Sequence, residues 1–148
     1  MTSDNGPSTG PATPASITDL DTAGTLLERM EIELGDVSAQ RVTASMPVAG
    51  NTQPYGLLHG GASAVLAETV GSVAAATHAA QTGRGRIAVG IELNCTHHRS
   101  ARSGSVHAVA DAIHLGRSLA TYEIRITDDE DRLVCTSRLT CMLRDGIA

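Results

Sequence analysis

Apolar and polar residues alternate along the chain in six segments, with the period of two that is expected of half-buried β-strands. Two segments lie before a long stretch without alternation, and four lie after it. In chain order they are residues 32–34, 42–48, 87–95, 106–114, 119–127 and 133–143. Turn residues separate them at Gly35-Asp36, Ser103-Gly104, Leu115-Gly116 and 128–131. Because strands joined by short turns run antiparallel, the last four segments are expected to be neighbours in one antiparallel sheet.

The stretch without alternation predicts one long helix over residues 62–80. It contains no proline, it is apolar nearly all round, and glycines at 83 and 85 end it, so a helix surrounded by protein fits it best. A second, short helix is expected over residues 19–30, with Asp19 or Asp21 as its cap. Together these elements indicate an α+β fold in which an antiparallel sheet wraps around one long central helix.

The composition indicates one domain with an aliphatic core. The chain has 148 residues, 41% of them are hydrophobic, and its only aromatic residues are Tyr55 and Tyr122. Residues 1–16 are rich in Pro, Ser, Thr and Gly and lack the basic and apolar regions of a secretory signal, so a flexible tail is expected there. Residues 17–148 are then expected to form the domain.

Charge and cysteine content exclude several classes of protein. The net charge is −5 and no segment concentrates Lys or Arg, so nucleic acid is not an expected partner. The helix over residues 62–80 is mostly alanine and contains polar residues, so it does not predict a membrane span. Cys95, Cys135 and Cys141 lack the spacing of a zinc or redox motif. They are expected to be reduced thiols in strands, as in a cytoplasmic protein.

No sequence motif predicts a metal or another cofactor. His97 and His98 are adjacent, and neighbouring residues of a strand point to opposite faces, so this pair is not expected to chelate one ion. The chain also lacks HExxH, GxSxG, P-loop and GxGxxG motifs. The common schemes of metal, serine-hydrolase and nucleotide chemistry are therefore unsupported.

Glu68 is the only formally charged residue between Gly60 and Thr82. A carboxylate among Ala, Val and Gly loses hydration, which is typical of active sites, although a glutamate that faces solvent would fit the pattern too. Ser72 lies four residues later, on the same face of the helix. Its hydroxyl could donate to the carboxylate, or bond to its own backbone as helical serines commonly do.

The run His59-Gly60-Gly61 lies where a loop becomes the long helix. The first N–H groups of a helix are unpaired and the helix dipole is positive there, so this position could stabilise a carbonyl oxygen that gains negative charge. A tight turn into a helix would use two glycines equally well. The position alone leaves both interpretations open.

The segment from Gln53 to Gly61, followed by Glu68, resembles the hotdog-fold thioesterases. Within them it is most similar to the branch that holds the phenylacetate-pathway enzymes and the Arthrobacter-type 4-hydroxybenzoyl-CoA thioesterases. The resemblance extends from about residue 32 to residue 143. It implies an acyl-CoA thioesterase that converts a thioester and water into a carboxylic acid and CoA, with CoA as part of the substrate and no cofactor.

The resemblance also implies a role for each residue of the motif. Gly60 would donate its N–H to the thioester oxygen, and His59 would orient the loop. Gln53 would contact the thioester or the attacking water. Glu68 would be the nucleophile or the general base, assisted by Ser72.

Further residues correspond to positions that bind substrate or CoA in the family, namely Gly61, Arg99, Arg102, Arg117 and Ser118. The arginines would bind phosphates, and residues 117–118 lie in a hairpin that the family uses around the nucleotide. One departure concerns residues 97–100, which read His-His-Arg-Ser in place of the usual aromatic-aromatic-Arg-Pro run. The resemblance therefore does not define the shape of the substrate pocket there.

Two other functions fit these residues less well. A hotdog hydratase or dehydratase would need a histidine paired with an acid, and a non-catalytic acyl-CoA-binding protein would not need Glu68 and Gly60.

Gly60 and Glu68 are eight positions apart, roughly 12 Å along a helix, so they cannot both reach one thioester carbon. The site is therefore expected to be shared between two subunits of a homodimer, and the resemblance implies a dimer of dimers, a homotetramer.

Overall fold

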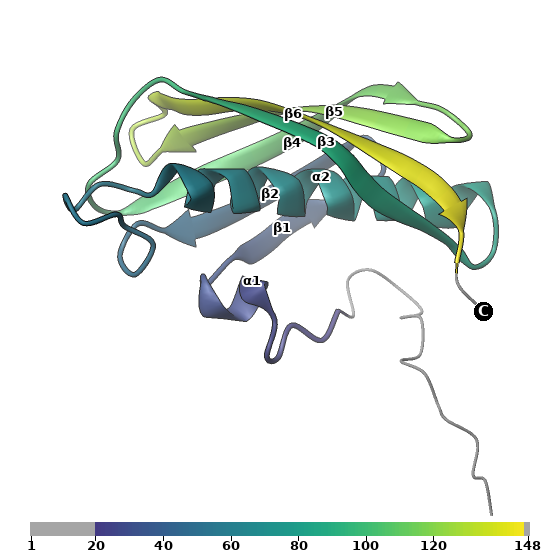
Figure 1. Ribbon diagram of the computed structural model, residues 1–148, viewed down its shortest axis with the longest axis horizontal. Helices are drawn as coiled ribbons and strands as arrows, with labels where there is room; N and C mark the ends of the chain where they lie inside the picture. Colours follow the sequence, from purple (N-terminus) through teal and green to yellow (C-terminus); the bar gives the residue numbers. More distant parts are fainter. Residues whose placement is uncertain (1–19, 147–148) are drawn as a thin grey trace, which may run out of the picture.

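A six-stranded antiparallel sheet wraps around one long helix in the computed structural model, which describes residues 20–146 (Figure 1). The helices are α1 (Leu26–Arg29) and α2 (Gly60–Thr82). The strands are β1 (Glu33–Val37), β2 (Arg41–Pro47), β3 (Arg86–His97), β4 (Ser105–Leu115), β5 (Leu119–Asp128) and β6 (Leu133–Asp145). The predicted α+β architecture is confirmed. The expected tail, residues 1–16, lies outside the described residues.

The small side chains of α2 let the sheet approach it closely. Buried residues occur all round this helix, as its uniform apolar sequence predicts. At Gly71 the backbone lies so close to Leu139 of β6 that an added Cβ would overlap the leucine side chain. Interiors are close-packed, so such contacts determine how tightly the sheet wraps the helix. No described helix has the length and apolar character that a membrane crossing needs.

Tyr122 joins the core to the turn that precedes β2. Its side chain is fully buried in β5 among aliphatic residues, and its hydroxyl donates to the carbonyl oxygen of Ala39 over 2.9 Å. Burial raises the pKa of this phenol, with a smaller contribution from the nearby Cys141. The hydroxyl therefore stays protonated and remains a donor to the turn.

The N-terminal elements differ from the sequence prediction. Only Leu26–Arg29 is helical, Asp19 lies outside the described residues, and Thr25 is the N-cap of α1. Asp21 does not cap α1 because its Oδ1 accepts from the N–H of Ala23, and Gly24 interrupts the helix with a φ of 72°. The predicted turn at residues 35–36 is also wrong. These residues belong to β1, where a shift in register between Leu34 and Val37 accommodates them, and the turn follows β1.

The order of strands corrects a second prediction. The sheet has the order β1-β2-β4-β5-β6-β3, so β3 pairs with β6 and leaves β4 to pair with β2 and β5. The expected neighbourhood of β3 and β4 is therefore wrong, although every strand pair is antiparallel. The connection between them crosses the start of α2 and is too long to act as a hairpin turn (Figure 1). As a result, β3 forms one edge of the sheet.

Candidate active site

One backbone N–H at the start of α2 is unpaired in the part of the chain that the structure describes. His59 is the N-cap, and its Nδ1 accepts from the N–H of Gly61 over 2.8 Å. Its own N–H donates to the carbonyl of Asn51 over 2.9 Å, which fixes the loop before the helix. Within residues 20–146, no hydrogen bond uses the N–H of Gly60. This donor lies at the positive end of the helix dipole.

A tight turn places Gln53 beside this donor. The N–H of Gly56 donates to the carbonyl of Gln53 over 2.9 Å, and the N–H of Gln53 donates to the carbonyl of Leu57 over 2.8 Å. The side-chain Oε1 of Gln53 accepts from the N–H of Tyr55, which leaves the NH₂ group to serve as a donor. The N–H of Leu58 bonds to the carbonyl of Ala101 over 2.8 Å and holds the loop against the β3–β4 connection.

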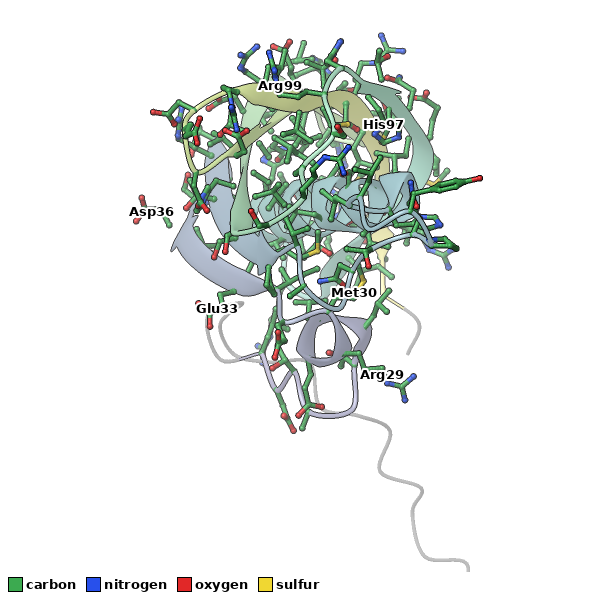
Figure 2. All side chains as sticks on the ribbon, turned by 90° about the vertical axis from the view of Figure 1, so that its left-hand side faces the viewer. Arg29, Met30, Glu33, Asp36, His97 and Arg99 are labelled. Carbon is green, nitrogen blue, oxygen red and sulfur yellow. The ribbon has the colours of Figure 1, made fainter. Side chains whose placement is uncertain are left out.

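A pocket of about 370 Å³ opens beside Gly60. Its apolar walls come from the loop before α2 and from β6, and its polar groups come from that loop, the first turn of α2, the last residue of β3 and the connection that follows β3. The lining residues are Gln53, Leu57, Leu58, Gly60, Ser63, His97, His98, Arg99, Ser100 and Val134. Figure 2 views the molecule from the end where α2 begins, and it shows His97 and Arg99 on the opposite side of this helix from Met30.

Two histidines line this pocket, which the alternation of strand residues did not predict. β3 ends at His97, so His98 is no longer a strand residue and both side chains reach the same pocket. His97 packs against Gly60, where an added Cβ would lie 2.9 Å from its Nε2. His98 Nε2 lies 2.7 Å from Thr136 Oγ1. In the sequence, only the unusual run at residues 97–100 indicated that the lining of the pocket differs here.

Glu68 and Ser72 form a second group, near the middle of α2. The Ser72 hydroxyl donates to Glu68 Oε1 over 2.9 Å, as their spacing predicts. Burial and, to a smaller extent, the charge of Glu68 raise the pKa of the Cys141 thiol to about 11. Glu68 is not a lining residue of the pocket beside Gly60. One chain therefore does not bring its own Glu68 and Gly60 together, in agreement with their separation along the helix.

The expected CoA-binding residues occupy separate regions of one chain. Arg99 lines the pocket beside Gly60, and Gly61 is in the first turn of α2. Arg102 lines an adjoining pocket of about 220 Å³ that also contains the acidic turn between β5 and β6. Arg117 and Ser118 lie in the exposed turn between β4 and β5.

Hydrogen bonds hold the turn between β4 and β5 at the end of α2. His78 Nε2 lies 2.9 Å from the carbonyl of Gly116, and Arg86 Nη1 donates to the carbonyl of Arg117 over 2.9 Å. Arg86 Nη1 also donates to Thr82 Oγ1, at the last residue of the helix. Along α2 the candidate residues therefore form three groups, at the start, the middle and the end of the helix.

A six-stranded antiparallel sheet wrapped around one long central helix defines the hotdog class of proteins. A family model described as Thioesterase superfamily matches residues 55–135. The chain belongs to this superfamily. The expectation of a thioester hydrolase is thereby confirmed at the level of the family, whereas the comparisons do not resolve the finer branch.

Two relatives and one solved structure support this assignment. The chain is 46% identical to the proofreading thioesterase EntH of Cronobacter turicensis over 79% of its own length and 84% of the relative. It is 43% identical to the 1,4-dihydroxy-2-naphthoyl-CoA hydrolase of Escherichia coli over 79% of its length and 85% of the relative. A thioesterase structure from Haemophilus influenzae matches with a TM-score of 0.79 and 36% identity over 86% of this chain and 87% of that one.

Proposed function

We propose that this protein hydrolyses an acyl-CoA thioester to a carboxylic acid and free CoA. The observation that carries this proposal is the N–H of Gly60, which has no partner among the described residues and lies at the start of α2 beside a pocket that also contains Gln53. A thioester oxygen bound there would accept from Gly60 and gain negative charge in the tetrahedral transition state. A preorganised donor of this kind contributes roughly 2.7–4 kcal/mol to catalysis.

Glu68 would supply the reacting carboxylate. It can attack the thioester carbon, expelling CoA thiolate and forming an anhydride that water then hydrolyses, or it can take a proton from the attacking water. A thiolate is a good leaving group, so neither route requires a strong general acid. The Ser72 hydroxyl that donates to Oε1 would orient the carboxylate in both routes.

Two subunits related by a two-fold axis would complete the site. Gly60 and Glu68 are eight residues apart on α2, which is roughly 12 Å along the helix axis, whereas reacting atoms must approach within about 3–3.5 Å. If two α2 helices pack antiparallel across the axis, Gly60 lies beside Glu68 of the partner subunit, and this occurs twice per dimer. We therefore propose a homodimer with two shared sites, and a dimer of dimers as the complete assembly.

The edge of the sheet at β3 suits such an interface. Val89 and Ile91 in this strand are 45% and 51% exposed, so β3 presents large aliphatic side chains at its surface. An unprotected edge with exposed aliphatic residues readily pairs with another strand. Gly90 lies between them and contacts Glu68, so an interface along β3 would pass next to the carboxylate.

We propose that the acyl group binds in the pocket beside Gly60 and that CoA extends from there to basic residues, of which Arg99 lines the pocket and Arg117 lies in the turn at the other end of α2. We propose that Arg99, Arg102, Arg117 and Ser118 bind the phosphates and nucleotide, with Gly61 near the thioester. Leucines and two imidazoles in the pocket favour an acyl group that combines an apolar body with a polar substituent. This preference agrees with the resemblance to the aryl-CoA branch and with the hydroxylated aromatic substrate in the name of the Escherichia coli relative.

A thiol-trap assay tests the function directly. The purified protein would be given benzoyl-CoA, 4-hydroxybenzoyl-CoA, hexanoyl-CoA and crotonyl-CoA, and released CoA thiol would be measured against the Glu68→Gln variant. Saturable release that depends on Glu68 is the expected result. A change in enoyl absorbance without thiol release would indicate a hydratase. Binding of these thioesters without any reaction would indicate a non-catalytic acyl-CoA-binding protein.

A further inference from the structure

We infer that Gly90 of β3 is a positioning residue for Glu68: it holds the Oε1 side of the carboxylate and leaves Oε2 as the reacting oxygen. This inference rests on the proposed function, because it concerns which atom of Glu68 reacts. The contact between position 90 and the carboxylate can be tested without any measurement of activity.

Gly90 forms a recess that the carboxylate of Glu68 fills. A Cβ added at Gly90 would overlap Glu68 Oε1 and would lie 3.2 Å from its Cδ and 3.4 Å from its Oε2. A contact this short with Oε1 cannot be accommodated unless the carboxylate moves. The same Oε1 accepts from the Ser72 hydroxyl over 2.9 Å. Ser72 therefore bonds to Oε1 from the helix side, and the missing side chain of Gly90 leaves room for this oxygen on the strand side.

The backbone conformation does not explain a glycine at this position. The glycines that adopt a positive φ within residues 20–146 are Gly24, Gly50, Gly56, Gly85 and Gly104, and Gly90 is not one of them. A glycine inside a strand weakens it, and it often marks a close approach to the backbone. Here the group that approaches is the carboxylate of Glu68, so the useful property of Gly90 is its lack of a side chain.

The strand is also irregular directly after Gly90. Pairing with β6 shifts register between Gly90 and Glu92, which leaves Ile91 as the extra residue of a β-bulge. Bulges beside active sites commonly redirect side chains or backbone. The residue paired with Gly90 is Cys141, a fully buried thiol that stays neutral near pH 7 and so does not repel the carboxylate.

The first test compares Gly90→Ala with Gly35→Ala. Gly35 is a matched control, because it too is a strand glycine without positive φ, and an added Cβ there would overlap the side-chain oxygen Oγ1 of Thr43, away from α2. Displacing a catalytic group by about 1 Å can cost 10²-fold. Gly90→Ala is expected to lower kcat by about 10- to 100-fold with KM changed less than about threefold. Gly35→Ala is expected to retain kcat.

The second test measures stability and does not require turnover. Melting temperatures would be compared for Gly90→Ala, Glu68→Ala and the double variant, with oligomer size checked for each. If the added methyl group meets only Glu68, its cost disappears once Glu68 is truncated, so the double variant is expected to melt at or above the temperature of Glu68→Ala, because alanine weakens a strand less than glycine does. This arm also applies if Gly90→Ala alone does not fold.

Two outcomes overturn the inference. One is a folded Gly90→Ala enzyme with kcat within about threefold of wild type, a change well below the 1.4 kcal/mol that corresponds to tenfold. The other is an equal loss of stability from Gly90→Ala with and without Glu68, which would mean that position 90 meets another group. If wild type itself releases no CoA, the proposed function fails. The melting temperatures still show whether a side chain at position 90 meets the Glu68 carboxylate.

Discussion

Each candidate residue at this site takes its role from one local contact. Gly60 has a backbone N–H without a partner between residues 20 and 146, and His59 is the N-cap that shapes the turn around it. Ser72 donates to a single oxygen of Glu68. These contacts separate two tasks, because the start of α2 would stabilise charge on the substrate and the middle of α2 would supply the reacting group.

Replacing Glu68 with Gln tests the second task. The amide oxygen can still accept from Ser72, so the fold and the KM are expected to stay near wild type. The amide cannot attack a carbonyl or take a proton, so kcat is expected to fall by at least about 100-fold, which is roughly 2.7 kcal/mol. Steady-state kinetics and circular dichroism check both halves. Activity within about threefold of wild type would remove Glu68 from the mechanism.

Arg99 and Arg117 are expected to bind the CoA phosphates. Arg99→Gln and Arg117→Gln should each raise the KM for acyl-CoA, with an effect that shrinks as salt screens the charges. An acyl-pantetheine thioester lacks the nucleotide and its 3′-phosphate, so its KM should change little. Comparing the two substrates at low and high salt makes the measurement. Equal responses of both substrates would show that these arginines do not act on the phosphates.

Some residues of the candidate site could be predicted from the sequence, and others could not. The loop, the two glycines and Glu68 were recognisable because their spacing along the chain is short and specific. The pocket placement of His98 was missed because alternation applies only inside a strand, and β3 ends one residue earlier. The close packing of Gly90 on Glu68 was not predictable, since it depends on how far the strand lies from the helix.

At the scale of elements, alternation located every strand but not every neighbour. It predicts which side chains face the core, and the buried positions of β2, β5 and β6 follow it. Alternation contains no information on which strands pair. For this reason β3 was expected beside β4, whereas it lies at the edge of the sheet next to β6. The length of α1 was overestimated, because Gly24 adopts a positive φ and the helix begins only after it.

The turn between β5 and β6 should lose stability in acid. Asp128 is buried, which by itself raises the pKa of its carboxyl group, but hydrogen bonds from Arg132 and from the N–H of Glu130 lower this pKa overall. A carboxylate with a lowered pKa stabilises the fold above its unfolded pKa of about 3.9, and this contribution is lost as the pH falls through its folded pKa.

Asp128→Asn tests this pH dependence. The amide removes the charge that pairs with Arg132 over 2.8 Å but keeps an acceptor oxygen. The variant is expected to melt below wild type at pH 7, and the difference should shrink as the pH falls below about 4. Melting curves from pH 7 to pH 2.5 would measure it. A difference that stays constant over this range would mean that the charge of Asp128 does not contribute.

At the scale of the whole molecule, one chain contains all the expected catalytic groups and separates them along α2. The pocket lies beside Gly60, whereas Glu68 lies against β3 at the edge of the sheet. A two-fold dimer would bring the groups together without any change in the fold of either chain. The activity is then expected to be a property of the pair of chains.

Mixed dimers test the shared site. Glu68→Ala removes the carboxylate, and Gly60→Ala places a Cβ 2.9 Å from His97 Nε2 and so narrows the pocket in which the thioester would bind. Each variant alone is expected to be nearly inactive. After equal amounts are unfolded and refolded together, about half of the dimers are mixed and contain one intact site of two, so about a quarter of wild-type activity should return. No recovery in proven mixed dimers, or full activity in a monomer, would contradict the model.

The burial of the cysteines has a practical consequence for the chemistry of the protein. Cys135 and Cys141 are fully buried, and burial raises the pKa of these thiols to about 12 and about 11, with further contributions from Cys95 and from Glu68. Since the thiolate is the reactive form, neither should react with disulfide reagents or peroxide while the protein is folded. Native protein should therefore titrate at most the half-buried Cys95, and unfolded protein all three thiols. Free CoA can then be counted by a coloured disulfide reagent almost without background from the enzyme.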